Sequence, residues 1–316
     1  MQPTQPPAGG QQIPYGFAGC YRHPDRLTGV RCVRCNRPIC PECQRPAAVG
    51  FQCPDDVKAG AATIRHGRTI LGNVVNDLPP LVSYGLIAIN VLVYLATGLS
   101  PGGTLANNQG SNLFNAWVLS PYDVGHNHEY LRLITSAFVH IGPIHLIFNM
   151  FALYMMGPGL ERLLGWWRFL AIYLIAGFGG SVAVLIFDSR GSAGASGAIF
   201  GLFAAALLLS RVVGFDTRPI LITVVLNFVI TFSVPFISKW GHIGGFVCGG
   251  LATLAVLGWT FSRGTLRDRN VQIAGLAGLL VLLVAVAAWR ANQISSQPVP
   301  SQQPIAAQYH DAPHGP

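Results

Sequence analysis

Seven apolar segments, each close to 20 residues long, follow one another between residues 81 and 290. They cover residues 81–98, 137–157, 168–187, 196–213, 218–237, 241–261 and 271–290. A helix needs about 20 predominantly apolar residues to cross the hydrocarbon core of a bilayer. Charged residues make up only 10% of the chain, whereas soluble domains carry about a quarter, and the mean hydropathy is +0.45. The sequence therefore predicts an all-α polytopic membrane protein with seven spans in the lipid bilayer.

The Lys and Arg residues predict how these spans are oriented. Nine of the twenty lie before residue 80, and the loops hold seven on the N-terminal side of the membrane against four on the other side. Because Lys and Arg accumulate in cytoplasmic loops, we expect a cytoplasmic N-terminus and, after seven spans, a C-terminus outside the cell membrane. The basic residues are not interleaved with aromatic ones, so nucleic acid is not an expected partner.

The loop between the first two spans, residues 99–136, is unusually long and lies on the outer side in this topology. It carries six large apolar or aromatic side chains: Leu113, Phe114, Trp117, Val118, Leu119 and Tyr122. Long loops of this kind inside a compact domain are usually functional, and we expect this one to be structured or to lie at the membrane interface.

Six polar residues lie inside or at the edges of the predicted spans. Ionisable and strongly polar groups at membrane depth are costly and are candidates for function, although a single intramembrane Ser more often joins two helices. Asn227 belongs to no motif and is interpreted as a packing residue. The six are His140, His145, Asn149, Ser196, Asn227 and His242.

Ser196 lies in the motif Gly194-Ala195-Ser196-Gly197, at the start of the fourth span. A helix N-terminus offers unpaired N–H groups and the positive end of the helix dipole, both of which favour a developing oxyanion. The flanking glycines allow a substrate backbone to come close. The motif alone is weak evidence, because small-residue patterns are common in membrane helices.

His242 opens the sixth span and is followed by glycines at every fourth position. Gly241, Gly245 and Gly249 predict a helix face that another helix can approach at backbone distance, and Gly197 and Gly201 give the fourth span a matching face. These two spans run in the same direction, so Ser196 and His242 are expected at one depth. A Ser–His hydrogen bond there would activate a nucleophile.

His145 and Asn149 add polar donors, because residues four apart share one helix face. An imidazole and an amide are suited to holding an oxyanion. The alternatives are a polar contact between helices or a metal site, and the lack of a carboxylate at metal-ligand spacing disfavours the metal.

The N-terminal region contains six of the seven cysteines, between Cys20 and Cys53. Four pairs of candidate metal ligands occur, each separated by two residues: Cys20 and His23, Cys32 and Cys35, Cys40 and Cys43, Cys53 and Asp56. Two tetrahedral Zn²⁺ sites need such a set, and 38 residues are too few for a sufficient apolar core. Disulfides are the alternative, but residues 1–19 have no apolar signal-peptide region. We expect structural zinc, with Asp56 as the weakest ligand and His66 as a possible replacement.

With these motifs in view, residues 81–261 resemble the rhomboid family of intramembrane serine proteases. The resemblance rests on His140, His145 and Asn149 in the second span, on the GxSG motif and on the GHxGG stretch, with Arg132 and Glu161-Arg162 at structural polar positions of the family. It implies a Ser196–His242 dyad without Asp, an oxyanion hole made by His145, Asn149 and the Ser196 N–H, and no catalytic cofactor. It further implies that Phe200, where some relatives have Tyr, packs on the His242 ring.

The cysteine-rich module resembles a B-box-type zinc finger, which implies that the first and third ligand pairs bind one ion and the second and fourth pairs the other. Its expected role is to recruit or respond to a protein partner. The predicted organisation is a tail (1–19), a zinc-binding module (20–57), a linker (58–80), a six-helix rhomboid core (81–261), a seventh C-terminal transmembrane helix (271–290) and a second tail (291–316).

Three functions are compatible with a membrane protein of this size. The first is a protease that cleaves transmembrane protein substrates. The second is a catalytically silent relative that binds membrane helices, and such relatives characteristically lack the Ser or the His that this chain keeps. The third, a seven-helix receptor or light-driven pump, would need a buried Lys or a carboxylate relay, and residues 271–290 contain neither.

Overall fold

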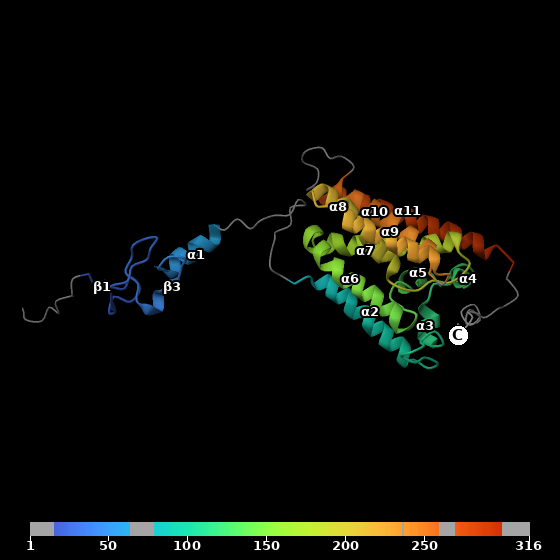
Figure 1. Cartoon of the computed structure of the whole chain (residues 1–316), viewed down its shortest axis with the longest axis horizontal. Coiled ribbons are helices and arrows are strands. Elements are labelled where there is room, and N and C mark those ends of the chain that lie inside the picture. The colour runs from blue at the N-terminus through green and yellow to red at the C-terminus, as the bar shows by residue number, and fades with distance from the viewer. Residues whose placement is uncertain (1–15, 64–78, 236, 259–268, 299–316) are drawn as a thin grey trace, which may run out of the picture. The chain divides into compact units, whose positions relative to one another are not determined.

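A computed structural model describes residues 16–63, 79–235, 237–258 and 269–298 (Figure 1). The chain divides into two units, residues 1–66 and 67–316, and each is described here by itself. Most of the two predicted tails, most of the predicted linker and His66 lie outside the described residues.

The first unit is built from short hairpins and one helix. Strands β1 (Ala18–Gly19) and β2 (Leu27–Thr28) pair antiparallel, as do β3 (Arg45–Pro46) and β4 (Phe51–Gln52). A 3₁₀ turn η1 (Pro41–Cys43) lies between the hairpins, and helix α1 (Pro54–Thr63) follows them. The helix therefore extends beyond residue 57, where the sequence placed the end of the module. The buried apolar side chains of the described part of this unit are Ile39 and five cysteines, Cys20, Cys32, Cys40, Cys43 and Cys53.

The second unit contains one long helix for each of the seven predicted spans. They are α2 (Leu81–Leu99), α6 (Gly142–Leu164), α7 (Trp166–Phe187), α8 (Ser196–Val213), α9 (Arg218–Ser233), α10 (Lys239–Leu257) and α11 (Arg269–Ser295). This confirms the predicted fold class, a helical membrane protein with a small cysteine-rich module before it. Among the described helices, α2, α7, α8, α10 and α11 are long and apolar enough to cross a membrane by themselves.

Several helix boundaries differ from the sequence prediction, and the start of α6 differs for an identifiable reason. The second span was expected from residue 137, but α6 begins at Gly142, which has a φ of +69° and is followed by Pro143. A positive φ is incompatible with a continuous α-helix, and Pro is favoured in the first helical turn. His140 therefore lies before the helix rather than on it. Helix α9 has 16 residues and ends at Ser233, earlier than the predicted residue 237.

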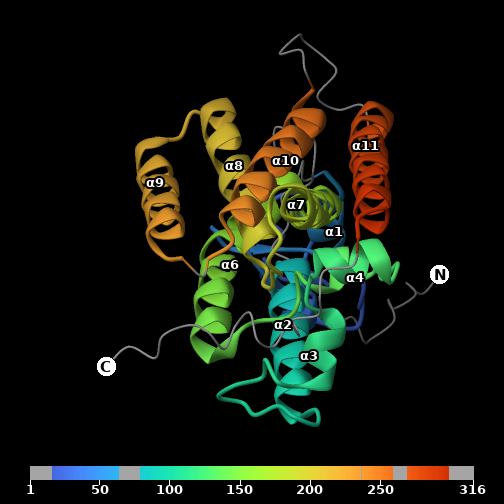
Figure 2. The same ribbon diagram turned by 90° about the vertical axis from the view of Figure 1, so that its right-hand side faces the viewer.

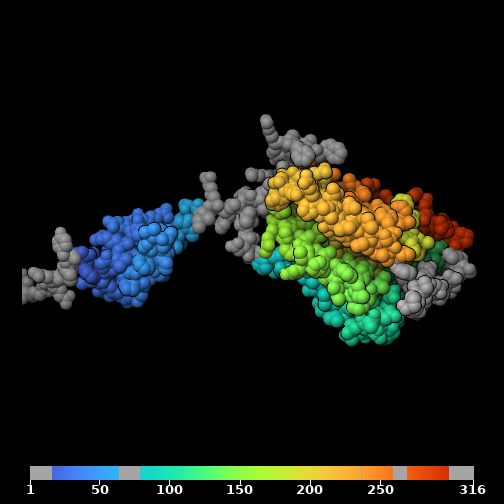
Figure 3. All heavy atoms as spheres, in the orientation of Figure 1, coloured from blue at the N-terminus to red at the C-terminus, as the bar shows by residue number. Residues whose placement is uncertain are grey.

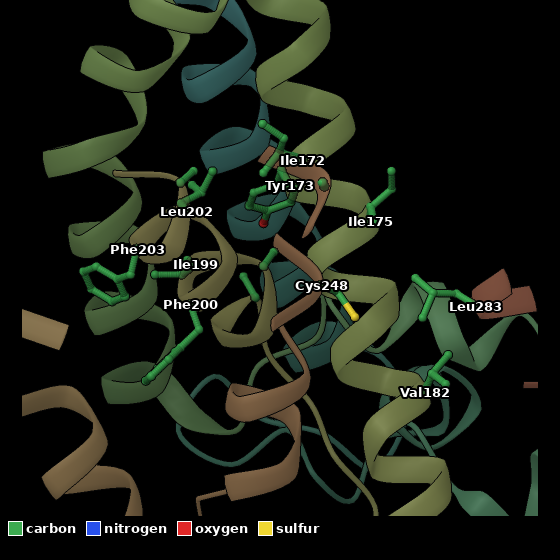
Figure 4. Close-up of a cluster of buried hydrophobic side chains, with 14 of the residues drawn as sticks. Ile172, Tyr173, Ile175, Val182, Ile199, Phe200, Leu202, Phe203, Cys248 and Leu283 are labelled. Atoms are coloured by element: carbon green, nitrogen blue, oxygen red, sulfur yellow. The ribbon is translucent and has the colours of Figure 1, made fainter. Parts of the chain in front are cut away.

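Helix α7 lies at the centre of the bundle, with α8 and α10 beside it (Figure 2). Glycine permits this close approach. A Cβ atom at Gly180 would lie 2.7 Å from the Gly241 carbonyl oxygen, and one at Gly245 would overlap the Gly197 carbonyl. Apolar side chains fill the remaining space, among them Ile172 and Tyr173 of α7 and Ile199 and Leu202 of α8 (Figure 4).

The outer faces of α6 and α9 are apolar and are visible in the space-filling view (Figure 3). Phe148 and Phe151 of α6 and Phe232 of α9 are each more than half exposed. Exposed apolar surface of this extent fits contact with lipid rather than with water.

The long loop between α2 and α6 is structured, as its length and composition predicted. It contains the short helices α3 (Asn112–Trp117), α4 (Pro121–His126) and α5 (Arg132–Thr135). Buried Arg132 connects them: its guanidinium donates to the carbonyls of Asn115 and Val118 and pairs with the Asp123 and Glu129 carboxylates. One buried cation with several acceptors thus fixes the loop that lies beside the start of α6.

Glu161, near the C-terminal end of α6, caps the N-terminus of α2. Its carboxylate accepts the Val82 and Ser83 N–H groups at 3.1 and 2.7 Å and the Ser83 hydroxyl at 2.7 Å. A carboxylate at this position satisfies orphan N–H groups and opposes the helix dipole. The structural role expected for Glu161 follows from these contacts.

Candidate active site and metal centres

The loop that precedes Ser196 is held by backbone contacts that require glycine. Gly194 has a φ of +118°, and its N–H donates to the Ser136 carbonyl at 2.9 Å. A Cβ at Gly194 would lie 2.8 Å from Nε2 of His145. Both the backbone angle and the neighbouring ring therefore exclude other residues at this position.

His140 supports the same loop from the segment before α6. Its Nδ1 lies 3.2 Å from the Phe138 carbonyl, and its Nε2 accepts the Ala195 N–H at 3.4 Å. A neutral imidazole protonated on Nδ1 satisfies both contacts. His140 thus helps to hold the residue immediately before Ser196, from a position outside the second span in which the sequence placed it.

Ser196 is the first residue of α8, with Ala195 at the cap position. The first N–H groups of a helix have no acceptor within the helix, so the Ser196 N–H and its hydroxyl are available at the same point. Ser196 also lines a small pocket together with Ser136, Ser181, Gly194 and Gly241. Among the described residues, the structure records no hydrogen bond for the Ser196 hydroxyl.

His242 is buried in the first turn of α10, where Ser238 caps the helix by accepting the Gly241 N–H at 3.2 Å. The Phe200 ring stacks on the imidazole with a centroid distance of 4.0 Å and an interplanar angle of 17°, as the resemblance implied. Thr231 of α9 contacts the ring edge, with its Oγ1 at 2.7 Å from Nδ1.

Contacts between the neighbours of Ser196 and His242 bring the starts of α8 and α10 together. A Cβ at Gly197 would lie 3.2 Å from the Gly241 carbonyl oxygen, and Gly180 of α7 lies against both of these glycines. Ser196 and His242 therefore lie at the same end of two helices in backbone contact. This is the arrangement that the repeated glycines of the sequence predicted.

His145 and Asn149 present donors from α6. The Ile141 N–H donates to Nδ1 of His145 at 3.3 Å, which leaves the proton of the neutral ring on Nε2, the atom next to Gly194. Asn149 is buried, and its amide donates to the His145 carbonyl at 2.9 Å. The His145 ring thus faces the loop of Ser196, whereas one Asn149 contact is within its own helix.

The first candidate metal centre consists of Cys20, His23, Cys40 and Cys43, whose ligand atoms all lie within 4.8 Å of one another. Nδ1 of His23 lies 3.9, 3.3 and 3.5 Å from the Cys20, Cys40 and Cys43 sulfurs. With Zn–S of about 2.3 Å and Zn–N of about 2.0 Å, a tetrahedron has S···N edges of about 3.6 Å. The four side chains fit such an ion, with Nδ1 as the histidine ligand atom.

The second centre consists of Cys32, Cys35, Cys53 and Asp56. The Cys35 and Cys53 sulfurs are 3.7 Å apart, close to the tetrahedral S···S edge of about 3.8 Å. Oδ2 of Asp56 lies 3.1 and 3.2 Å from the Cys32 and Cys53 sulfurs. The first and third ligand pairs thus form one centre and the second and fourth pairs form the other, as the B-box resemblance implied.

The ligands of the two centres differ in acidity. Asp56 and burial raise the pKa of Cys35 to about 12, and burial together with the neighbouring Cys20 and Cys40 thiols raises the pKa of Cys43 to about 11. Hydrogen bonds from the Cys35, Cys32 and Cys53 thiols lower the pKa of Asp56 to about 2, so that its carboxylate is ionised at neutral pH. Burial raises the pKa of Cys20, but the backbone donors of Cys40, Arg22 and His23 outweigh it and lower the pKa to about 6. All seven cysteines are free, so the structure does not contain the disulfides that were the sequence alternative.

Three residues that position the active site were missed by the sequence analysis. Gly179 and Gly180 of α7 contact α10 as closely as the glycines of α8 do, and only the approach of the fourth and sixth spans was predicted. Thr231 gave no signal, because Thr is ordinary in a membrane helix. Its contact with His242 depends on how α9 packs.

A family model and several known proteins match part of this chain. The family model of the Rhomboid domain matches residues 127–262. Rhomboid protease GluP of Bacillus subtilis is 37% identical over 187 residues, covering 57% of this chain and 35% of GluP. RHOMBOID-like protein 4 of Arabidopsis thaliana is 33% identical over 53% of this chain and 46% of its own length. The chain thus spans about a third of GluP and less than half of the Arabidopsis protein.

A shorter relative is covered more completely. The Bacillus subtilis rhomboid protein YdcA is 35% identical over 141 residues, which make up 42% of this chain and 70% of YdcA. The domain match includes α8 and α10, the helices that contain Ser196 and His242. The chain is a multi-pass membrane protein that belongs to the rhomboid family.

Proposed function

We propose that the chain is an intramembrane serine endopeptidase that cleaves transmembrane protein substrates, with Ser196 as nucleophile and His242 as general base. The observation that carries the proposal is the contact of Gly197 with Gly241, which places the starts of α8 and α10 side by side. A nucleophile and its base must lie within reach of one hydrogen bond, and apo geometries are often looser than the reacting complex.

In the proposed reaction the Ser196 hydroxyl oxygen attacks the carbonyl carbon of the scissile peptide bond, and Nε2 of His242 takes the hydroxyl proton. The oxyanion is stabilised by the Ser196 N–H, Nε2–H of His145 and the Asn149 amide, and each such donor is typically worth about 10²–10³-fold in kcat. His242 then returns its proton to the leaving amine. A water molecule, activated by the same imidazole, hydrolyses the acyl-enzyme.

The second candidate function is a catalytically silent rhomboid that binds membrane helices. It is favoured by the absence, among the described residues, of a hydrogen bond between the Ser196 hydroxyl and His242. The presence of both residues, the positive φ of Gly194 two residues before Ser196 and the donors of α6 favour the protease.

The two functions are separated by incubating the purified protein in detergent with a generic transmembrane reporter, beside Ser196→Ala and His242→Ala variants. The protease predicts cleavage by the wild type and none by either variant. Reporter binding without cleavage by all three proteins would support the silent alternative, and equal cleavage by all three would exclude Ser196 as nucleophile.

We infer that the N-terminal module binds two structural Zn²⁺ ions. The donor sets Cys₃His and Cys₃Asp support this assignment, and the ions would supply the cross-links that fold so small a unit. Metal analysis of the isolated 1–70 segment tests it: two ions per chain are expected, one ion would point to an empty Asp56 site, and none would contradict it. Recruitment of a protein partner is the role proposed for the module.

The proposed topology has the N-terminus in the cytoplasm and the C-terminus outside a cell membrane. It rests on the distribution of Lys and Arg over the loops. Labelling of variants with one added cysteine in intact cells, with an impermeant maleimide, would test it: a cysteine added in residues 299–316 is expected to increase labelling above that of the wild type, and one added in residues 1–15 is not.

A further inference from the structure

Thr231 is a buried residue of α9 whose hydroxyl touches the imidazole of His242. Its Oγ1 lies 2.7 Å from Nδ1 of His242 and 2.8 Å from the backbone carbonyl of Asn227, one helical turn earlier. Thr231 is 3% exposed and His242 is 7% exposed. Water therefore has little access to this edge of the ring, and the hydroxyl is the described partner of Nδ1.

The two contacts of the hydroxyl determine how protons can be shared. A hydroxyl carries one hydrogen and can accept at its lone pairs. When it donates to the Asn227 carbonyl, its oxygen is an acceptor for Nδ1–H, and the two bonds strengthen each other. The neutral imidazole then has its proton on Nδ1 and a free lone pair on Nε2, which is the form that can accept a proton from a serine.

The same arrangement suits the charged imidazole formed during the reaction. An imidazolium donates from both nitrogens, and Thr231 can accept from Nδ1 without rearranging. Phe200 fixes the plane of the ring from its face, and Thr231 fixes its rotation from its edge. A neutral hydroxyl also avoids the desolvation cost of a buried carboxylate.

Building on the proposed protease function, we propose that Thr231 is a positioning residue for the base: its hydroxyl holds Nδ1–H of His242 and directs Nε2 towards Ser196. It performs the orienting part of the role that an Asp performs in a Ser-His-Asp triad. Helix α9 thereby contributes to the reaction, although none of its residues contacts the scissile bond in this proposal.

The test compares Thr231→Val, which removes the hydroxyl and keeps the shape, with Thr231→Ser, which keeps the hydroxyl. Thr253→Val is the matched control, because the buried Thr253 hydroxyl bonds the Gly249 carbonyl of its own helix at 2.7 Å and does not touch the site. Thermal unfolding in detergent is measured for every variant, and kcat and KM are measured with a transmembrane reporter.

Since general-base catalysis contributes about 10²–10⁴-fold, loss of its orientation in Thr231→Val is expected to lower kcat by about 10- to 100-fold with KM little changed. Thr231→Ser is expected to stay within about threefold of the wild type, as is Thr253→Val. If the valine variant does not fold, Thr231→Ala carries the same expectation.

Three results would overturn the proposal: wild-type kcat in Thr231→Val, an equal loss in Thr231→Ser and Thr231→Val, or an equal loss in Thr253→Val. Failure of the underlying function looks different. If the wild type does not cleave, or if Ser196→Ala cleaves as well as the wild type, the protease assignment itself fails before Thr231 is compared.

Discussion

The N-terminal module and the helical bundle bury different kinds of side chain. In the described part of the module, the buried apolar residues are Ile39 and cysteines that surround two candidate metal centres, while Val33 and Val49 are exposed. The bundle buries large aliphatic and aromatic side chains throughout, and its central helices meet at glycines. We therefore expect metal ligands to stabilise the module and close packing to stabilise the bundle. Different perturbations should unfold the two regions.

Removal of metal should have the largest effect, and only on the module. Because binding free energy of structural zinc, about 10–16 kcal/mol in finger peptides, acts as folding free energy, chelation is expected to unfold the isolated 1–70 segment. Circular dichroism and limited proteolysis would follow this loss. The full-length protein is expected to keep its bundle helicity under the same chelator, and loss of that helicity would contradict the comparison.

Adding one methyl group should have the next largest effect, and only in the bundle. Gly245→Ala places a Cβ against the Gly197 backbone, and overpacking of this kind costs about 1–3 kcal/mol, or more where backbone must move. A lowered unfolding temperature in detergent is expected. Gly278→Ala of α11 is the control, because a Cβ there meets nothing within 4 Å, and equal losses in both variants would refute the close-contact explanation.

Glu161→Gln should destabilise the bundle by an intermediate amount. The substitution keeps the side-chain shape but weakens three hydrogen bonds to Val82 and Ser83. Hydrogen bonds to charged groups contribute about 1.5–3 kcal/mol, so we expect a loss of about 2 kcal/mol in free energy of unfolding. An unchanged unfolding midpoint in denaturant would show that the cap is not a stabilising contact.

Asp56→Asn should have the smallest effect, because it perturbs one ligand of one centre. The amide lacks the charge that Asp56 keeps at neutral pH, its pKa being lowered to about 2 by the Cys35, Cys32 and Cys53 thiols. We expect the 1–70 segment to retain one ion firmly and to release the other to a competing chelator. Asp56→Cys should instead hold the second ion firmly. Equal release of both ions from the wild type and from the variants would contradict this prediction.

The comparison also explains how far the sequence predicts each region. In the module, the sequence spacing of the ligands is informative. Ligand pairs separated by two residues, taken together with the B-box resemblance, predicted both candidate metal centres. In the bundle, hydropathy located the helices, and the repeated glycines indicated that α8 and α10 meet. The start of α6 at Gly142 was not predicted, because an apolar run continues through residues 137–141 while the backbone angle at Gly142 interrupts the helix.

The contacts that complete the site could not be predicted for a similar reason. His140 contacts Ala195 across 55 positions of the chain, and Thr231 meets His242 only because α9 packs beside α10. His140 was a candidate from the sequence, but no local pattern links it to Ala195, and none marks Thr231 at all. Phe200 was predictable, because the rhomboid resemblance supplied a position where an aromatic ring packs on the base.

Cleavage of a transmembrane reporter by wild type and Ser196→Ala tests the central claim most directly. The proposed dyad predicts that the wild type cuts the reporter into two fragments and that Ser196→Ala forms none above background, at equal amounts of folded protein judged by helicity and unfolding temperature. Equal product from both proteins would contradict the assignment of Ser196 as the nucleophile.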